Sequence, residues 1–336
     1  MRWESWPHGE AFLKEWEQLL SHKRIPAAML WVGPEGVGKT PLAWTLAQAL
    51  LCPKGDLAYA CGTCGDCQVV AKLEHPFFWL LPPTGGGKPL EEALPLFRQA
   101  LSQDPFLSLS EWEKLLLGGR GSLSIGVEEV RHLQGFLTLA STQAVWRVVL
   151  FWHAELLTRQ AANALLKIVE EPPERTLFLF LATRVEALPA TLRSRCQIKK
   201  FPPLSAQVLE KLAGTSLSVA QLSLAQGSYS RLRRVMDPAQ APYIEALRAW
   251  LRALLQPAGD TDWLPLIETL AQAPQLSDLL LMGVSLIREH PHLSLPQKNL
   301  GIDTFLRVAD EIEAHLNPLL LLAEATVTLR QYWQKK

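Results

Sequence analysis

The chain has 336 residues, and its 33 lysines and arginines balance its 33 aspartates and glutamates. This length predicts two or three domains, and the balanced charge provides no bulk attraction toward nucleic acid or an acidic membrane. The chain has no charged and apolar leader and no apolar run of about 18 residues, so we expect a cytoplasmic protein without a membrane partner.

Four apolar runs predict the strands of a parallel sheet. Each run is apolar at consecutive positions, as in strands that are buried on both faces, and helical patterns separate them. The pattern therefore predicts an α/β domain over residues 1–203. The four runs are 27–32, 77–81, 148–152 and 176–183.

Helical patterns occupy the remaining segments. Thr158 is a suitable N-cap for a helix that ends at Pro172, and residues 84–122 read as an insertion with some helix. Beyond the α/β domain, Ser218 and Gln221 fit a capping box inside a small helical domain, 204–237. Residues 238–336 are predicted to form a helix bundle.

The stretch GPEGVGKT is a complete phosphate-loop pattern between a predicted strand and a predicted helix. Its glycines allow backbone N–H groups to surround phosphate oxygens, its lysine reaches the terminal phosphates, and its threonine hydroxyl suits Mg²⁺. The alternative is a degenerate loop that is kept only for structure, which Pro41 in the first helical turn favours. The residues concerned are Gly33, Pro34, Glu35, Gly36, Val37, Gly38, Lys39 and Thr40.

Four of the five cysteines lie close together, at positions 52, 61, 64 and 67. Four thiolates complete a tetrahedral zinc shell without an open position, so this spacing predicts a structural zinc module over 52–67. Scattered buried thiols are the alternative, and the knuckle-like text CGTCGDC argues against it. The predicted ligands are Cys52, Cys61, Cys64 and Cys67.

Together with the loop and the cysteines, the texts IPAAMLWVGPEGVGKT, TRQAANALLKIVEEPP and LPATLRSRCQ resemble one family over about residues 20–235. They are similar to the AAA+ clamp-loader subunits of bacterial DNA polymerase III, the gamma/tau and delta-prime group. The resemblance implies an AAA+ domain over 1–203, a helical lid over 204–237 and a helical oligomerisation collar over 238–336. It also implies a five-membered ring with gamma/tau and delta subunits, which acts on the sliding clamp and primer-template DNA.

In hydrolysing members of this family, the third strand ends in an Asp-Glu pair that holds the metal and positions water. Counting back from Asn163 gives Trp152 and His153 at these positions. Neither an indole nor a neutral imidazole is a good ligand for a hard metal ion, and Glu155 falls beyond the predicted end of the strand. We therefore expect the chain to bind ATP or ADP, with Mg²⁺ as a further cofactor, but not to hydrolyse ATP at a useful rate.

The triplet Ser194-Arg195-Cys196 is intact, and the resemblance implies that Arg195 acts as an arginine finger in the ATP site of a neighbouring subunit. An ordinary surface arginine is the alternative. The resemblance also implies that Thr183 senses the terminal phosphate and that Arg231 contacts nucleotide from the lid. For Thr183, the alternative is a strand-end threonine that makes only a local hydrogen bond. For Arg231, the alternative is that another arginine of the text RLRR makes the contact.

These features favour a delta-prime-type subunit of the clamp loader, a part of the polymerase holoenzyme that assists hydrolysis without performing it. One alternative is a gamma/tau-like ATPase motor subunit with an unorthodox metal site. Another is a stand-alone zinc-bearing ATP sensor with a different partner.

Overall fold

The computed structural model describes residues 2–22, 25–118, 121–139, 146–256, 262–273, 276–313 and 316–333. The chain divides into two compact units, Met1–Leu204 and Ser205–Lys336. No helix within these described ranges is long and apolar enough to cross a membrane. The division of the chain into three domains at 203 and 237 stays a prediction.

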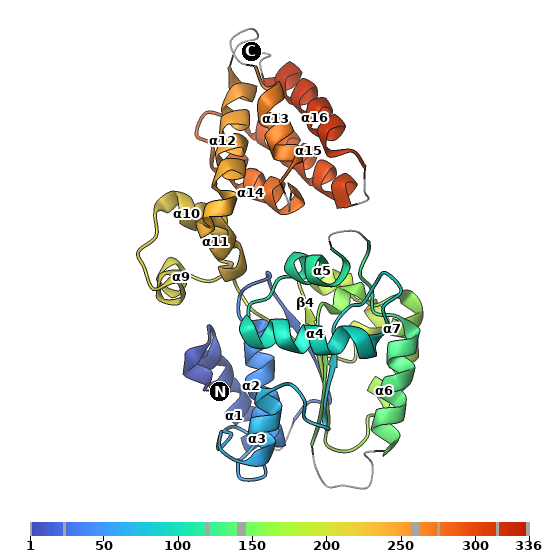
Figure 1. The fold of residues 1–336 in the computed structure, drawn as a ribbon. Helices are drawn as coiled ribbons and strands as arrows, with labels where there is room; N and C mark the ends of the chain where they lie inside the picture. The colour runs from blue at the N-terminus through green and yellow to red at the C-terminus, as the bar shows by residue number, and fades with distance from the viewer. Residues whose placement is uncertain are drawn as a thin grey trace. The chain divides into compact units, whose positions relative to one another are not determined.

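A five-stranded sheet forms the centre of the first unit (Figure 1). All neighbouring strands pair in parallel, in the order β2-β3-β4-β1-β5. The four predicted strands are confirmed, each to within one residue at either end. The strands are β1 (Ala28–Val32), β2 (Phe78–Leu81), β3 (Arg147–Phe151), β4 (Thr176–Ala182) and β5 (Gln197–Lys200).

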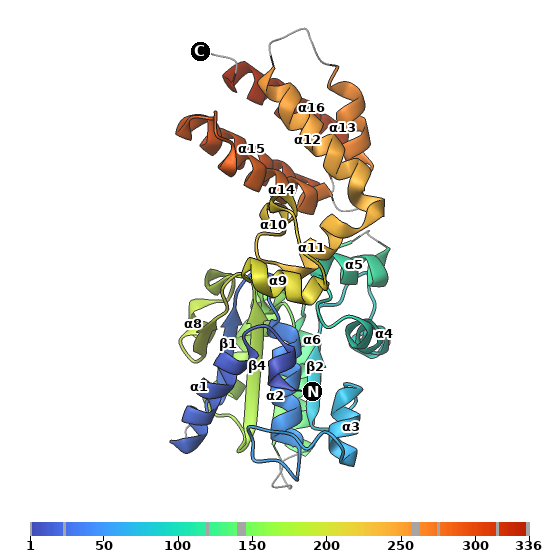
Figure 2. The same ribbon diagram turned by 90° about the vertical axis from the view of Figure 1, so that its left-hand side faces the viewer.

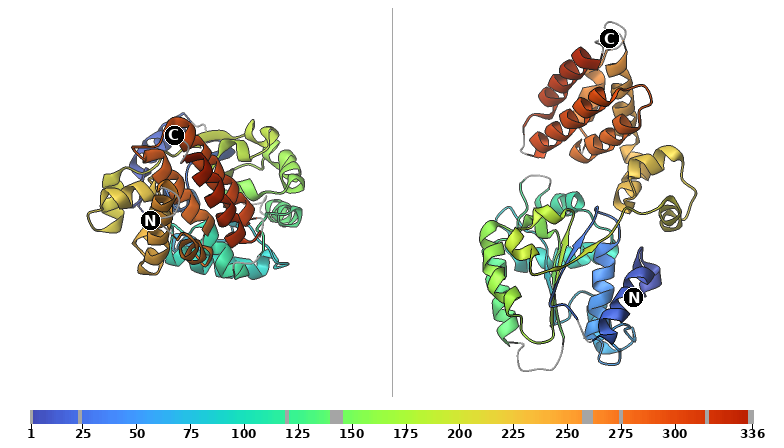
Figure 3. Two further views of the ribbon diagram at one scale, coloured as in Figure 1. Left: turned by 90° about the horizontal axis from the view of Figure 1, so that it is seen from above. Right: turned by 180° about the vertical axis from the view of Figure 1, so that it is seen from behind.

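Helices cover both faces of the sheet, which explains the unbroken apolar runs. Leu30, Phe151 and Phe180 share one core with α6 (Val127–Leu139) and α7 (Arg159–Glu170). The opposite face packs against α1 (Gly9–Ser21) and α2 (Lys39–Leu51). Figure 2 shows α1 and α2 in front of the sheet, and Figure 3 (right) shows α6 in green and α2 in blue on opposite sides of it.

Helix α7 begins and ends where the sequence predicts. The Thr158 hydroxyl accepts a hydrogen bond from the Ala161 N–H at 3.2 Å, which satisfies a donor that has no partner within the helix. The helix ends at Glu170, before the two prolines at 172 and 173.

Strand β5 has no counterpart among the predicted strands. Its sequence, QIKK, is polar and largely exposed, because β5 lies at the edge of the sheet and pairs with β1 alone. An edge strand needs no continuous apolar run, so the pattern that revealed the other strands is absent here.

The predicted insertion, 84–122, contains two helices, α4 (Leu90–Gln103) and α5 (Leu109–Leu117). Shorter helical elements also belong to the first unit. They are η1 (Trp3–Ser5), α3 (Gly65–Ala71), η3 (Ala154–Leu156), η4 (Val185–Ala187) and α8 (Ala190–Arg193).

Among the described residues of the second unit, helices are the only regular secondary structure, and loops connect them. Trp250, Phe305 and Leu322 lie in its core, and Ser218 and Gln221 form the predicted capping box. The predicted fold class is therefore confirmed in its layout, a parallel α/β unit followed by helices. The helices are α9 (Ala206–Ala213), α10 (Val219–Ala225), α11 (Tyr229–Met236), α12 (Ala241–Leu255), α13 (Leu264–Ala271), α14 (Leu276–Glu289), α15 (Leu295–Glu313) and α16 (Pro318–Trp333).

Candidate functional site

The predicted phosphate loop connects β1 to α2 at the carboxyl end of the sheet. Gly36 and Gly38 adopt positive φ angles of 72° and 97°, which suit glycine. A Cβ atom at Gly33 would lie 2.2 Å from the carbonyl oxygen of Phe201, so this position also requires glycine. The loop pattern thus has a local structural reason at these three glycines.

Lys39 turns back onto the loop in this structure. Its Nζ donates hydrogen bonds to the carbonyl oxygens of Gly33 at 2.6 Å and Pro34 at 2.7 Å. The side chain is buried, and burial lowers the pKa of Lys39 to about 8 against the opposing charges of Glu155 and Glu35. Two of the three N–H groups of the Lys39 ammonium are therefore bonded to the loop itself, and the third is left for a phosphate oxygen.

Trp152 occupies the first of the two positions at which the sequence resemblance implies a metal-binding acid. It follows β3 directly, is 2% exposed, and donates a hydrogen bond from its indole Nε1 to the Thr40 hydroxyl at 3.2 Å. The hydroxyl predicted to hold Mg²⁺ therefore faces an indole N–H rather than a carboxylate.

His153 occupies the second position and lies between two carboxylates. Its Nε2 lies 3.3 Å from Glu35 Oε1, and its Nδ1 lies 3.1 Å from Glu155 Oε1. Burial acts to lower the pKa of His153, but the hydrogen bonds and charges of the two carboxylates outweigh it and raise the pKa to about 9. The two carboxylates thus favour the protonated ring at neutral pH, whereas the expectation from the sequence was a neutral imidazole.

Glu155 does lie beyond the end of β3, as expected, but its carboxylate turns back into the site. Glu155 Oε1 accepts hydrogen bonds from the Thr183 hydroxyl at 3.0 Å and from the Thr183 N–H at 3.3 Å. Burial acts to raise the pKa of Glu155, yet the hydrogen bond and charge of His153 leave it lowered. Thr183, the predicted phosphate sensor, is thus bonded to a carboxylate within its own unit.

These residues line one pocket, to which the insertion also contributes. Lys39, Thr40 and Thr183 lie on its wall together with Trp152 and His153. The segment between α4 and α5 adds Pro105, Phe106 and Leu107. Sequence reasoning missed these three residues because no motif marks them, and only the fold brings them to the loop.

The Glu35 carboxylate joins the insertion to the loop. Its Oε1 accepts a hydrogen bond from the backbone N–H of Leu109 at 2.5 Å, across 74 residues of sequence. Leu109 is the first residue of α5, whose capping box is formed by Ser108 and Glu111. Glu35, predicted only as part of the phosphate pattern, is therefore also a tertiary contact.

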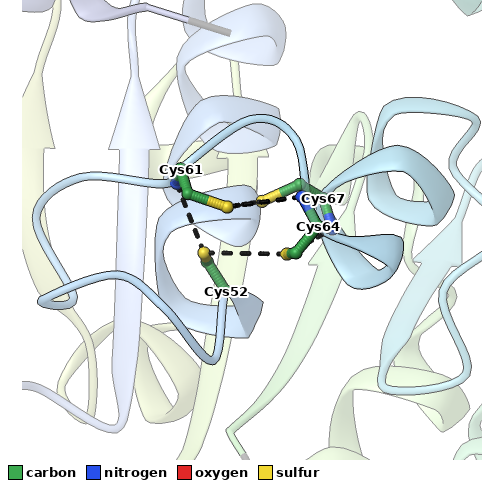
Figure 4. A group of neighbouring side chains, drawn as sticks. All are labelled: Cys52, Cys61, Cys64 and Cys67. Atoms are coloured by element: carbon green, nitrogen blue, oxygen red, sulfur yellow. Dashed lines mark hydrogen bonds between the residues drawn. The ribbon is translucent and has the colours of Figure 1, made fainter.

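The four predicted zinc ligands lie together (Figure 4). The sulfur atoms lie 3.9 Å apart both in the Cys52–Cys64 pair and in the Cys61–Cys67 pair. Four sulfurs bound to zinc at about 2.3 Å in a tetrahedron are roughly 3.8 Å apart, so the donor set fits the ion.

The backbone around the cluster also suits thiolates. The N–H groups of Cys61, Cys64 and Cys67 donate to cluster sulfurs at 3.3 to 3.4 Å. Backbone N–H groups of Thr63 and Cys64 lower the pKa of Cys61 to about 6, whereas burial raises the pKa of Cys67. A bound cation would stabilise the buried thiolate that burial alone disfavours.

Arg195 lies between α8 (Ala190–Arg193) and β5 at the surface of the first unit. Its Nη1 donates to the Thr191 carbonyl oxygen at 2.6 Å, and its Nη2 pairs with Glu170 at the end of α7. About a third of the side chain is exposed, 34%. The finger role stays a prediction, and the guanidinium is held at the end of α7 within its own chain.

Arg231 belongs to the second unit. It lies on α11, where its backbone N–H donates to the Ser228 hydroxyl and its guanidinium bonds to Gln226. The lid contact with nucleotide stays a prediction.

The model of the family described as DNA polymerase III, delta subunit, matches residues 9–205. The chain belongs to this family. The match covers the whole sheet, the phosphate loop and the cysteine cluster, so the predicted α/β domain of this family is confirmed.

Three curated relatives illustrate the match. The DNA polymerase III subunit delta' of Pseudomonas aeruginosa is 33% identical over 199 residues, which are 59% of this chain and 50% of that protein. The Escherichia coli K12 subunit delta' is 28% identical over 96% of this chain and 86% of that protein. The Mycobacterium tuberculosis subunit gamma/tau is 31% identical over 56% of this chain and 26% of that protein.

These relatives confirm the predicted resemblance to the gamma/tau and delta-prime group, with delta' as the family. The match with the Escherichia coli protein extends beyond residue 235, further than the motifs predicted. For the Pseudomonas aeruginosa relative, the chain spans half of the relative's length. A solved structure of a Thermotoga maritima gamma subunit-related protein covers 96% of this chain and 99% of its own, at 16% identity and a TM-score of 0.47.

Proposed function

We propose that this chain is a delta-prime-type clamp-loader subunit that binds nucleotide at Lys39 without hydrolysing it. In this proposal, Arg195 enters the ATP site of a neighbouring subunit and stabilises the charge that develops during phosphoryl transfer. The partners are gamma/tau and delta subunits in a five-membered ring, and the substrate of the assembly is a sliding clamp that is placed on primed DNA. A structural zinc ion at the four cysteines completes the subunit.

One observation supports this proposal above all others, the chemistry at positions 152 and 153. Trp152 donates to Thr40, and His153 is a buried cation that is already bonded to Glu35 and Glu155. A divalent metal at this point would meet a positive charge instead of a carboxylate. Positioning of the metal and water provides most of the catalysis in phosphoryl transfer, so this exchange removes hydrolysis rather than weakening it slightly.

The finger role in this proposal depends on the surface residue Arg195. Its guanidinium carries a permanent charge and lies at the surface, bonded to Glu170 and Thr191. Its pair with Glu170 is charge-assisted, and a neighbour's triphosphate offers acceptors of the same kind with a larger negative charge. In this proposal, the arginine exchanges the first set of acceptors for the second when the ring forms.

The deciding experiment is the DNA- and clamp-stimulated ATPase rate of a reconstituted loader that carries either the wild-type chain or Arg195→Ala. We expect hydrolysis at the neighbour's site to fall on the order of 10³-fold, with the ring still assembled. Arg159→Ala is the matched control, because Arg159 is an exposed arginine of the same unit. Equal rates for all three chains would remove the finger role.

A gamma/tau-like motor is the second candidate, and one observation favours it. Glu155 places a carboxylate against the pocket residues Thr183 and His153, and its buried Oε2 has no hydrogen-bond partner among the described residues. If Glu155 served as the missing acid, Glu155→Gln and Lys39→Ala would each abolish ATP turnover by the isolated chain. Under our proposal, the wild-type chain alone shows no turnover for these variants to lose.

A further inference from the structure

The segment of residues 104–117, here called the cap segment, covers one side of the phosphate-loop pocket. It consists of the turn after α4, which contributes Phe106 and Leu107 to the pocket wall, and of α5. Trp112 anchors α5 to the rest of the unit, because its side chain is fully buried and its Nε1 donates to the Pro83 carbonyl oxygen at 2.8 Å. The cap segment is therefore a packed part of the unit.

Aromatic packing continues from the cap segment to the positions of the missing acids. The Phe97 ring lies 5.0 Å from the Trp112 ring and 5.0 Å from the Trp152 ring. Trp152 in turn bonds to Thr40 at the start of α2. The insertion and the loop thus share one continuous set of contacts.

Glu35 provides the polar part of this connection. Its Oε1 accepts from the Leu109 N–H at 2.5 Å and lies 3.3 Å from His153 Nε2. The first N–H groups of a helix have no partner within the helix, and the positive end of the helix dipole favours a carboxylate. Two donors from distant elements therefore fix one side chain of the phosphate loop.

This arrangement conflicts with a bound polyphosphate. Phosphate binding needs inward-facing loop N–H groups and the Lys39 ammonium, and two of the three N–H groups of this ammonium here bond to the carbonyl oxygens of Gly33 and Pro34. A polyphosphate would also bring negative charge close to Glu35 and Glu155. Nucleotide binding therefore requires at least the Glu35 carboxylate to move.

We propose that the cap segment is an internal gate of the phosphate loop, which the Glu35 carboxylate latches shut through the Leu109 N–H. A nucleoside di- or triphosphate binds at Lys39 only when this latch opens, so nucleotide binding and release of α5 are coupled. The gate rests on the proposed nucleotide binding and is independent of the Arg195 finger.

The chain offers a substitution that removes the latch donor and exchanges the half-buried Leu109 side chain for a smaller apolar ring. Leu109→Pro deletes the N–H that Glu35 accepts, at the first position of a helix, where proline is well tolerated. The preceding residue, Ser108, already has the extended backbone that proline requires, with φ −92° and ψ 159°. Glu35→Gln is the complementary variant, since it removes the charge and keeps the shape.

The experiment is a titration of the purified full chain with a fluorescent methylanthraniloyl-ADP in the presence of Mg²⁺. We expect Leu109→Pro and Glu35→Gln each to bind about tenfold more tightly than the wild type, since each loses a hydrogen bond to a charged group that holds the gate closed. Glu92→Gln, an exposed charge change on α4, is the matched control and should bind like the wild type. Lys39→Ala should lose binding.

Hydrogen exchange provides a second readout on the unmodified chain. Addition of ADP should increase amide exchange over residues 108–112, because opening releases the first turn of α5. Protection of these amides by ADP, or equal ADP affinity of the wild type and both latch variants, would overturn the gate. Undetectable binding by every variant would overturn it too, while the finger role would still be decided by the ATPase rate of the reconstituted loader.

Discussion

His153 shows how a single residue changes the chemistry of the phosphate-loop pocket. Burial alone disfavours the charged imidazole, but contacts with Glu35 at 3.3 Å and Glu155 at 3.1 Å reverse this effect. The position that carries a metal-binding acid in hydrolysing relatives therefore carries a positive charge here. Under the proposed function, this change of sign accounts for the absence of hydrolysis, and a single carboxylate placed at 152 would still meet this cation.

The raised pKa of His153 makes its contribution to stability depend on pH. Its folded pKa, about 9, lies above the unfolded value of 6.5, so this contribution is complete below pH 6.5 and is lost as the pH rises through 9. Lys39 acts in the opposite direction, because its lowered pKa of about 8 costs stability below pH 8, and the cost disappears toward pH 10.5.

We therefore compare the wild type with His153→Gln, so that effects common to both chains cancel. The wild type should have the larger free energy of unfolding at pH 6, and the difference should shrink toward pH 9. Urea unfolding at several pH values measures this difference. A difference that stays constant or grows over this range would show that His153 is not held as a cation.

At the scale of elements, tryptophan indoles connect segments that are far apart in the sequence. Trp3 and Trp16 donate from their Nε1 atoms to the carbonyl oxygens of Ala58 at 2.8 Å and Leu57 at 2.9 Å, inside the zinc module. Trp44 of α2 donates to the Val70 carbonyl oxygen at 2.8 Å, at the end of α3. Part of the high tryptophan content, 12 residues, thus has a structural role, since an indole combines a large apolar area with one N–H donor.

Removal of the zinc ion should loosen the module and leave the sheet intact. Cys64→Ser should lower bound zinc from about one ion per chain to nearly none, because a structural site needs all four thiolates. Hydrogen exchange should then rise over residues 52–67 and stay low in β1. Cys196→Ser is the matched control, since Cys196 is not part of the cluster, and its zinc content should match that of the wild type.

Some elements of the fold could be predicted from the sequence, and others could not. Strands β1 to β4 and helix α7 were predictable, because buried strands need continuous apolar runs and a helix needs a cap and a stop. The cysteine cluster was predictable from spacing alone. Strand β5 was missed because a polar edge strand leaves no apolar signal.

The sequence did not predict the tertiary contacts of Glu35 and Glu155, and the reason differs from that for β5. The bond between Glu35 and Leu109 joins residues 74 positions apart, and neither residue type signals such a contact. The position of Glu155 was predictable, but the return of its carboxylate toward Thr183 depends on the short turn Ala154–Leu156 that follows β3. Local patterns predict elements, whereas these contacts depend on where the elements meet.

At the scale of the whole molecule, each of the two units has its own core. In the second unit, Trp250 is fully buried, stacks on Phe305 at 5.2 Å and donates to the Thr326 hydroxyl at 2.9 Å. In the first unit, the core lies between the sheet and α6 and α7. Damage to one core should therefore be seen first within its own unit.

Trp250→Ala tests this expectation. The lost packing and the lost indole hydrogen bond to Thr326, whose hydroxyl still donates to the Leu322 carbonyl oxygen, should cost about 3–5 kcal/mol of local stability, with raised hydrogen exchange in α12 and α16. Exchange in β1 and β4, and the zinc content, should stay at wild-type values. Equal loss of protection in both units would mean that they unfold as one.

Trp152 gives the pocket a built-in optical reporter. Its indole lies on the pocket wall, and its N–H bonds to the Thr40 hydroxyl, the group predicted to turn toward Mg²⁺ when nucleotide arrives. The emission of an indole depends on the partner of its N–H and on nearby charge, so the ligand state of this loop should be visible as a change in fluorescence. Subtraction of the Trp152→Phe spectrum would isolate this one chromophore, so the residue at the predicted acid position would report the ligand state of the loop.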